Sequence, residues 1–264
     1  MKLRSVLLSA LLATGAIALC AAQDQFPPLH GHCSIAPGTK DGQVRFELEE
    51  DACGDDHQDC HNHDSDSMPL SAFSGFTLSD LQREGAHLDA VISAEAGQLT
   101  CSGTVHDLTL SGDSTFVPNP GFVAQMRQMG FDDFDSRKLE AYTLFHIEIS
   151  WIRSLQAEGI AGMDSGNLIA LRIFKVDATY VREMTKLGYP HLAAGKLIAF
   201  KVQGVNPEEV RQYRTLGYQP SADELIQMRI FKVTPDFIQR MRAHGLGNLT
   251  ISKLVQIRIF KLAD

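Results

Sequence analysis

The sequence predicts an α+β fold, in which a small antiparallel β domain precedes a C-terminal α-solenoid of five helical hairpins. Three observations carry this prediction. A unit of 28 to 29 residues recurs five times between Asn119 and Leu262, and such self-similarity is typical of a solenoid. Each unit contains the signals that begin and end two short helices. The segment before the units instead carries alternating and β-branched residues, as strands do.

The first half of each unit predicts one helix. The units begin at Asn119, Glu148, Asp177, Asn206 and Thr234. In four of them the first side chain has an oxygen that can accept hydrogen bonds from the first helical turn, and in three a proline suits the next position. A glycine followed by a bulky apolar residue then ends the helix in the left-handed conformation. These glycines are Gly130, Gly159, Gly188, Gly217 and Gly245.

The second half of each unit predicts another helix. Its first position is occupied by Asp135, Asp164, Ala193, Ser221 and Thr250, of which four can cap a helix. Ser221 and Glu224 have the spacing of a capping box. Asn206 and Glu209 have the same spacing, and we take this as the reason why Glu209 interrupts an otherwise aromatic column of Phe122, Trp151, Tyr180 and Phe237.

Two columns are apolar in every unit and predict the core. One is Leu139, Leu168, Leu197, Leu225 and Leu254, and the other is Val123, Ile152, Val181, Val210 and Ile238. A single short hairpin cannot bury its apolar face alone, so neighbouring units must stack. The repeats are therefore expected to form one domain over residues 118–264.

The first 22 residues predict a secretory signal peptide. Lys2 and Arg4 precede an apolar run over residues 6–19, and the small residues Ala21 and Ala22 offer a cleavage site. Leu19 stands where lipidation signals require a small residue, which argues against a lipid anchor at Cys20. No other stretch has the length of apolar sequence that a membrane span needs. We expect a periplasmic or secreted protein with no transmembrane segment after cleavage.

Residues 23–117 predict the β domain. Expected strands are Val44–Leu48, His87–Ala94, Gln98–His106 and Leu108–Val117, and an acidic loop rich in His and Asp is expected over residues 51–67. Export makes disulfides plausible among the four cysteines that remain. These are Cys33, Cys53, Cys60 and Cys101, and their pairing is left open.

The acidic loop contains one candidate metal site. Residues 55–64 hold three imidazoles, four carboxylates and a thiol. Zinc and copper accept imidazole and thiolate ligands, so His57, Cys60, His61 and His63 are the candidate ligands for either ion. The alternative is a solvated loop with adventitious metal affinity, because the spaced pairs of a structural zinc site are absent. The sequence indicates no other cofactor.

Charge is shared unevenly between the two parts. Residues 23–118 contain 17 acidic and three basic residues, whereas residues 119–264 contain 15 acidic and 19 basic. The parts can attract each other or a partner, or the acidic loop can simply keep the protein soluble. Four equivalent cations, Arg172, Lys201, Arg229 and Arg258, are expected to align into a basic binding surface. Their alternative role is that of solvated cations at helix C-termini.

The motifs of several function classes are missing. The sequence contains no HExxH, GxSxG, SxxK, Walker or GxGxxG pattern, so no catalytic residue is nominated and no enzyme is expected. An acidic, exported chain without a recognisable binding motif gives no support to nucleic-acid binding.

The junction from Ser114 to Val123 and the motifs at Thr234–Ile238 and Ser221–Ile226 resemble those of a known group. The chain resembles bacterial exported helical-repeat proteins of uncharacterised function, whose repeats are similar to the extracytoplasmic extensions of BlaR-type membrane metallopeptidases. The strand around Cys101 is similar to one that precedes this junction in the family. The resemblance implies a sensory or interaction role outside the cytoplasm.

The expected function is therefore an exported, non-enzymatic binding or sensory module. Its helical-repeat surface is expected to contact a protein or a component of the cell envelope. The alternative is a periplasmic protein that binds a divalent metal through the four loop residues named above.

Overall fold

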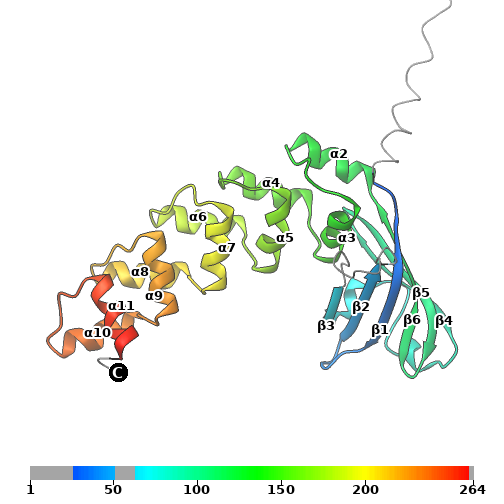
Figure 1. Cartoon of the computed structure of the whole chain (residues 1–264), viewed down its shortest axis with the longest axis horizontal. Helices are drawn as coiled ribbons and strands as arrows, with labels where there is room; N and C mark the ends of the chain where they lie inside the picture. The colour runs from blue at the N-terminus through cyan, green and yellow to red at the C-terminus, as the bar shows by residue number, and fades with distance from the viewer. Residues whose placement is uncertain (1–25, 51–62, 262–264) are drawn as a thin grey trace, which may run out of the picture. The chain divides into compact units, whose positions relative to one another are not determined.

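The computed structural model describes residues 26–50 and 63–261. Within these ranges the chain combines a curled, antiparallel six-stranded sheet with ten α-helices that follow it (Figure 1). The contacts divide the chain into two compact units. We call residues 26–128 and 135–144 the sheet unit, and residues 129–134 and 145–261 the helical unit. The mixed α and β composition predicted from the sequence is confirmed.

The sheet runs in the order β3-β2-β1-β6-β5-β4, and every neighbouring pair of strands is antiparallel. The strands are β1 (Leu29–Pro37), β2 (Gln43–Glu50), β3 (His63–Pro69), β4 (His87–Ala94), β5 (Gly97–His106) and β6 (Thr109–Pro118). Two short 3₁₀ helices, Leu70–Ala72 and Asp80–Gln82, connect β3 to β4.

The four predicted strands correspond to β2, β4, β5 and β6. Two further strands differ from expectation. β1 lies between β2 and β6, and residues 63–67, placed in a loop from their composition, form most of β3. β3 pairs only with β2, at the edge of the sheet, where polar residues are tolerated because one side of the strand has no partner strand. The rest of the predicted loop, residues 51–62, lies outside the described residues.

The disulfide between Cys33 of β1 and Cys101 of β5 shows that the sheet is strongly curled. The two strands flank β6, and their Cα atoms at the disulfide are 5.9 Å apart. In a flat sheet, strands two steps apart are separated by about 9.5 Å. The curl therefore brings these cysteines into the range that a disulfide can span.

Two paired glycines allow strands β5 and β6 to approach closely beside this disulfide. Gly103 lies opposite Gly112. A Cβ atom on Gly112 would lie 2.1 Å from the carbonyl oxygen of Ser102, and one on Gly103 would lie 2.2 Å from that of Ser111. Because both obstacles are backbone atoms, any larger residue would push the two strands apart.

The core of the sheet unit lies between one face of the sheet and a helix. Alternate strand residues such as Ile35, Phe46, Leu99 and Phe116 are fully buried. Helices α2 (Pro120–Gln128) and α3 (Ser136–Leu144) complete the unit, and α3 contacts β4, β5 and β6. The ring of Tyr142 on α3 is fully buried and meets Phe122 of α2 edge to face at 6.2 Å.

The helical unit consists of two layers (Figure 1). Helices α4 (Ile149–Ala157), α6 (Ala178–Lys186), α8 (Pro207–Thr215) and α10 (Pro235–Ala243) contact one another in succession and form what we call the first-helix layer. Helices α5 (Ser165–Ile173), α7 (Ala194–Val202), α9 (Ala222–Ile230) and α11 (Ile251–Phe260) do the same and form the second-helix layer.

The predicted helix starts and stops are confirmed. Side chains of Asp177, Asn206 and Thr234 each accept a hydrogen bond from a backbone N–H of the first turn, and Ser221 and Glu224 form the expected capping box. The glycines that follow the first helices have φ between +69° and +87°. The leucine column and the β-branched column are both buried: within them Leu168, Leu197 and Ile152 have no exposed surface.

A second left-handed position was not predicted. Each second helix also ends in a residue with positive φ, at Lys175 (54°), Gly204 (70°), Lys232 (56°) and Lys261 (51°). The backbone N–H of Val176 bonds to the carbonyl of Leu171 and that of Lys175 to the carbonyl of Arg172, which together make a Schellman motif. Each second helix therefore ends sharply, just after its last apolar residues.

Candidate functional site

Four apolar side chains form a row on the surface of the second-helix layer. Ile173, Val202, Ile230 and Ile259 occupy one equivalent position at the ends of α5, α7, α9 and α11, and their residues are 47%, 50%, 50% and 47% exposed. We call these four residues the apolar stripe. Such a row differs from apolar residues scattered singly on a surface, which are normal in soluble proteins and need no explanation.

Helix geometry explains why these residues face outwards while their neighbours are buried. On α5, Leu168 and Leu171 have no exposed surface, and Ile173 follows Leu171 by two positions. Two positions correspond to a rotation of about 200° on an α-helix. The side chain of Ile173 therefore leaves the opposite face from the buried leucines. Phe174 and Phe260, which follow the stripe residues on α5 and α11, are 39% and 67% exposed and extend the apolar area.

The stripe is regular because the helices that carry it are neighbours. α5 contacts α7, α7 contacts α9, and α9 contacts α11. Packed helices lie roughly 8–10 Å apart, so four rungs span about 30 Å. This length is that of an extended peptide of about nine residues.

The stripe lies in the basic layer of the helical unit. Residues 164–176, 193–205, 221–233 and 250–261, which contain the second helices, hold nine basic and three acidic residues. The first helices and their connections, residues 148–163, 177–192, 206–220 and 234–249, hold seven of each. The excess positive charge of the helical unit therefore belongs to the layer that exposes the apolar row.

The four cations predicted as a binding surface lie between successive helices. Arg172 donates from Nε to the carbonyl of Phe145 at 3.2 Å, and Arg229 and Arg258 donate in the same way to Gln203 at 3.0 Å and Lys232 at 3.1 Å. Each of these carbonyls lies 26 or 27 residues earlier in the chain. These arginines therefore join one repeat to the end of the preceding second helix.

Three of the cations also stack on the aromatic column. Arg172 lies 5.5 Å from the ring centre of Trp151, Lys201 lies 4.3 Å from that of Tyr180, and Arg258 lies 4.1 Å from that of Phe237. Cation–π contacts of this kind stabilise packing. The structure thus gives all four cations a packing role, the three arginines between repeats and Lys201 within its own repeat, and their role in binding an external partner stays a prediction.

Glu209 replaces the aromatic ring beneath the fourth cation, Arg229. Arg229 Nη1 donates to Glu209 Oε2 at 2.7 Å, and the hydroxyl of Tyr213 lies 2.9 Å from Glu209 Oε1. Asn206 does accept the backbone N–H of Glu209, as predicted, but the glutamate side chain serves the arginine. A charge partner for Arg229, and not a capping box, explains the break in the aromatic column.

The remaining polar atoms of the aromatic column tie the first helix of a repeat to the end of the same repeat. Trp151 Nε1 donates to the carbonyl of Val176 at 3.3 Å, and the Tyr180 hydroxyl donates to that of Val205 at 2.9 Å. Burial raises the pKa of the Tyr180 hydroxyl well above its usual value, and burial does the same for Tyr213, with the carboxylate of Glu209 adding to the effect. Both hydroxyls therefore stay protonated, so that they remain donors at ordinary pH.

The candidate metal ligands fall mostly beyond what the structure describes. His57, Cys60 and His61 lie outside the described residues, as does Cys53. His63 is the first residue of β3, and its ring centre is 6.1 Å from that of Phe46. Among residues 26–50 and 63–261 no group of three or more His, Cys, Asp or Glu side chains is arranged to hold a metal ion.

Two further findings bear on the predicted properties of the chain. The disulfide between Cys33 and Cys101 confirms that cysteines of the β domain pair. None of the helices in the part that the structure describes combines the length and apolar character needed to cross a bilayer.

Sequence reasoning missed the apolar stripe. Its signal is an Ile or Val directly after each cation of the predicted basic column, as in Arg172–Ile173 and Arg229–Ile230. Because apolar columns in a repeat usually indicate core, a column that instead faces solvent cannot be separated from core until the helix ends are known.

Comparison of the chain with models of protein families, with curated proteins and with solved structures finds no match.

Proposed function

We propose that this protein is an exported, non-enzymatic binding or sensory module, whose apolar stripe docks a segment of a protein partner in the cell envelope. In this proposal helices α2 to α11 form an α-solenoid of five helical hairpins that holds the stripe in place. The observation that carries the proposal is the row itself, four β-branched side chains that are each about half exposed at one repeated position.

The energetics favour a docking role for this row. Solvent-exposed apolar area is costly when it is contiguous, and larger apolar patches with a polar rim mark interaction sites. The cations beside the stripe are already in contact with other groups: Arg172 donates to a backbone carbonyl, and Lys201 and Arg258 stack on aromatic rings. The stacked helices place the four side chains in a preformed arrangement, so a partner does not have to order them on binding.

The same features define the chemistry of the partner. Rungs about 10 Å apart match every third residue of an extended chain, or every seventh residue of a helix. The nine basic and three acidic residues of the second-helix layer favour an acidic segment. We therefore propose a segment with apolar side chains at one of these spacings and acidic residues between them. The resemblance of the repeats to extensions of membrane sensors is compatible with this role.

A capture experiment with matched variants tests the proposal. Mature protein (residues 23–264) is immobilised in three forms: the wild type, a stripe variant (Ile173→Gln, Val202→Gln, Ile230→Gln) and a control variant (Ser150→Gln, Thr179→Gln, Arg240→Gln). The control positions are exposed residues of the first-helix layer. Bound proteins from an envelope extract, and bound peptides from an acidic, apolar-spaced library, are quantified by mass spectrometry.

We expect the wild type and the control variant to retain the same proteins and peptides, and the stripe variant to lose them by about tenfold or more. Circular dichroism should show equal helix content in all three forms, because the substituted side chains are exposed. Equal capture by the stripe variant, or a loss shared with the control variant, would show that the stripe is not the binding surface.

A further inference from the structure

Four lysines of the second-helix layer can meet a partner without breaking an internal contact. Of the nine basic residues in this layer, the four cations of the predicted basic column pack against other groups, and Lys196 pairs with Asp223. Among the described residues, no hydrogen bond, ion pair or ring contact involves the other four side chains. These belong to Lys175, Lys232, Lys253 and Lys261, which are all exposed.

The acidic residues of this layer are already occupied. Asp164 and Glu224 cap helices α5 and α9, and Asp223 pairs with Lys196. The positive charge of the four lysines is therefore not neutralised by carboxylates of their own layer, and it is available to an acidic partner.

Three of these lysines share one repeated position. Each follows its residue of the apolar stripe by two positions, and φ is 54° at Lys175, 56° at Lys232 and 51° at Lys261. Two residues span at most about 7 Å, so the backbone of each lysine lies beside one residue of the stripe. We call these three residues the lysine row.

A lysine at this position costs conformational free energy. The left-handed conformation brings Cβ close to the following carbonyl oxygen, so helices usually place glycine there. The third repeat has Gly204, whose Cβ would also lie 2.9 Å from Arg229 Nη2. The first repeat has His146, but there the equivalent of the stripe residue is Leu144, which is buried. Three of the four stripe residues are thus followed by a lysine in spite of the backbone strain, and such strain is a feature of functional positions.

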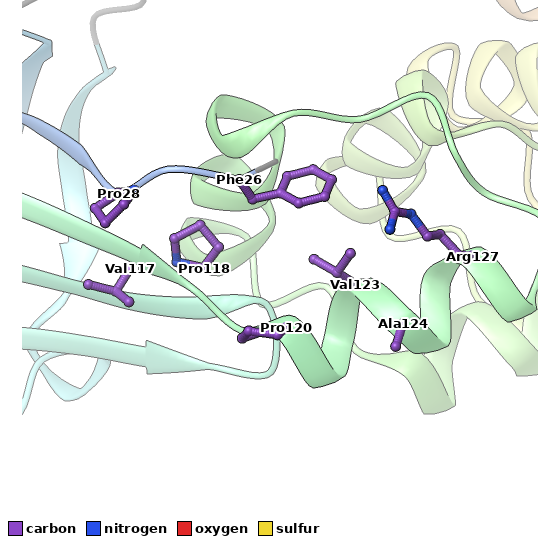
Figure 2. A pocket seen from close by; sticks show the side chains of 8 residues that line it. All are labelled: Phe26, Pro28, Val117, Pro118, Pro120, Val123, Ala124 and Arg127. Carbon is purple, nitrogen blue, oxygen red and sulfur yellow. The ribbon is translucent and has the colours of Figure 1, made fainter. Parts of the chain in front are cut away.

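The apolar hollow of the sheet unit offers no comparable charge. It has a volume of about 330 Å³, and Phe26, Val117, Val123 and Arg127 are among the residues that line it (Figure 2). The guanidinium carbon of Arg127 lies 5.3 Å from the ring centre of Phe26, and both side chains already have partners within the chain. In the second-helix layer, by contrast, available cations stand beside exposed apolar side chains.

We propose that the lysine row contacts acidic residues of the segment that docks on the apolar stripe. This inference rests on the proposed function, and it names the groups that select an acidic partner. An ammonium on a flexible stem does not require one fixed geometry, so aspartate and glutamate both suit it. The partner is a protein segment because its apolar side chains must occupy the stripe at the same time.

The glycine in the third repeat predicts a pattern in the partner. Packed helices lie roughly 10 Å apart, so Lys232 and Lys261 are separated by about 10 Å, and Lys175 and Lys232 by about 20 Å. An extended chain of the polyproline II type has three residues per turn and presents the same face about every 9 Å. The segment should therefore carry an acidic residue beside three of four successive apolar residues, with none required beside the one that meets Val202.

A designed peptide is the probe for this pattern. It has twelve residues, with leucine at every third position, proline before each leucine and glutamate after it, and a second peptide has glutamine in place of glutamate. Fluorescence anisotropy measures the binding of each to the mature protein. We expect the glutamine peptide to bind about tenfold more weakly, and added salt to weaken binding of the glutamate peptide alone. Replacing one glutamate at a time should weaken binding at three positions and leave it unchanged at one inner position.

Matched variants test whether the lysine row supplies the charge. The row variant is Lys175→Gly/Lys232→Gly, and a charge control, Lys186→Gln/Arg240→Gln, removes the same charge from exposed positions of the first-helix layer. We expect the row variant to bind the glutamate peptide about fivefold more weakly and the glutamine peptide as the wild type does, and the charge control to bind both normally. Because glycine relieves the strain, the row variant should also unfold at a temperature about 2–4 °C higher.

Several outcomes would overturn this proposal. Equal affinity for the two peptides or unchanged binding by the row variant would show that the lysines do not select the partner, and a lower unfolding temperature would show that they serve the helix ends instead. Vesicles of phosphatidylglycerol bound through the lysine row, with no preference for the glutamate peptide, would assign the row to a membrane surface. The proposed function itself fails if neither peptide binds, or if the stripe variant binds both as the wild type does, and the lysine row then has no segment to contact.

Discussion

Contacts in the sheet unit join segments that are far apart in the chain, whereas those in the helical unit join each helix to its nearest neighbours. Strand β1 pairs with both β2 and β6, and Cys33 is linked to Cys101, 68 residues away. In the helical unit the interhelical hydrogen bonds of Trp151, Tyr180 and Arg229 all span 20 to 26 residues. In the sheet unit a stabilising contact such as the disulfide occurs once, whereas in the helical unit the same kind of contact recurs in several repeats.

This difference determines how a substitution spreads. In a sheet closed by one long-range link, loss of that link affects every strand inside the loop. In a stack of similar units, stability is approximately a sum of local terms and of terms between neighbours. A change in the sheet unit should therefore be felt throughout that unit, and a change in the helical unit should stay close to its own repeat.

Removal of the disulfide should have the largest effect. The double variant Cys33→Ala/Cys101→Ala should lower the free energy of unfolding of the sheet unit by about 4 kcal/mol, the chain-entropy value for a loop of this length. Hydrogen exchange followed by mass spectrometry should show faster exchange in β5 and β6, with exchange in α7 and α9 unchanged. Equal acceleration in both units would show that they do not differ in the way described.

Glycine-to-alanine substitutions should change the free energy of unfolding with opposite signs in the two units. Gly112→Ala places a Cβ 2.1 Å from the carbonyl of Ser102 and should destabilise the sheet unit by roughly 2–3 kcal/mol. Gly195→Ala in helix α7 meets nothing within 4 Å and should stabilise the helical unit by about 0.5 kcal/mol, because alanine favours the helix. Thermal unfolding of the two variants measures both values, and a shift of the same sign in both would contradict the assignment.

The Glu209–Arg229 pair should show a smaller, local effect. Arg229→Gln leaves a carboxylate whose side chain is only 11% exposed without its cation, and should cost about 2 kcal/mol. Glu209→Phe restores the aromatic residue found at this position in the other repeats, so Arg229 can stack on it as Arg258 stacks on Phe237.

We therefore expect a cost below about 1 kcal/mol for Glu209→Phe, measured by denaturant unfolding. The matched control is Arg211→Gln, which removes an exposed arginine from the same helix. If Glu209→Phe were as destabilising as Arg229→Gln, the carboxylate would have a role beyond replacing the ring.

Local signals made most of the helical unit predictable from the sequence. The N-cap of Asp177, the capping box of Ser221 and the left-handed glycines each depend on residues within a few positions, so one sequence contains the information. The apolar columns were also clear, because the repeat shows each position several times. The ends of the second helices were not predictable, since Lys175 and Lys232 adopt a conformation for which glycine is the usual signal and Gly204 is the only glycine in that column.

Features set by long-range pairing were less predictable. β1 contains His30, Gly31 and His32 and has little strand preference of its own, yet it pairs on both sides. The edge strand β3 is polar because pairing with β2, and not burial, defines it. The apolar stripe was hidden for a different reason: exposure depends on where the helix ends, and composition alone does not distinguish an outward isoleucine from a core one.

The bond between Cys33 and Cys101 also makes the chain between them a closed ring that includes β2, β3 and β4. A protease that cleaves one peptide bond between these cysteines would leave both fragments covalently attached. On an electrophoresis gel without reductant such a nicked molecule would migrate as one species, and it would separate into two only when the sulfur bridge is reduced. One such cut in this unit would thus leave the molecule with all of its parts.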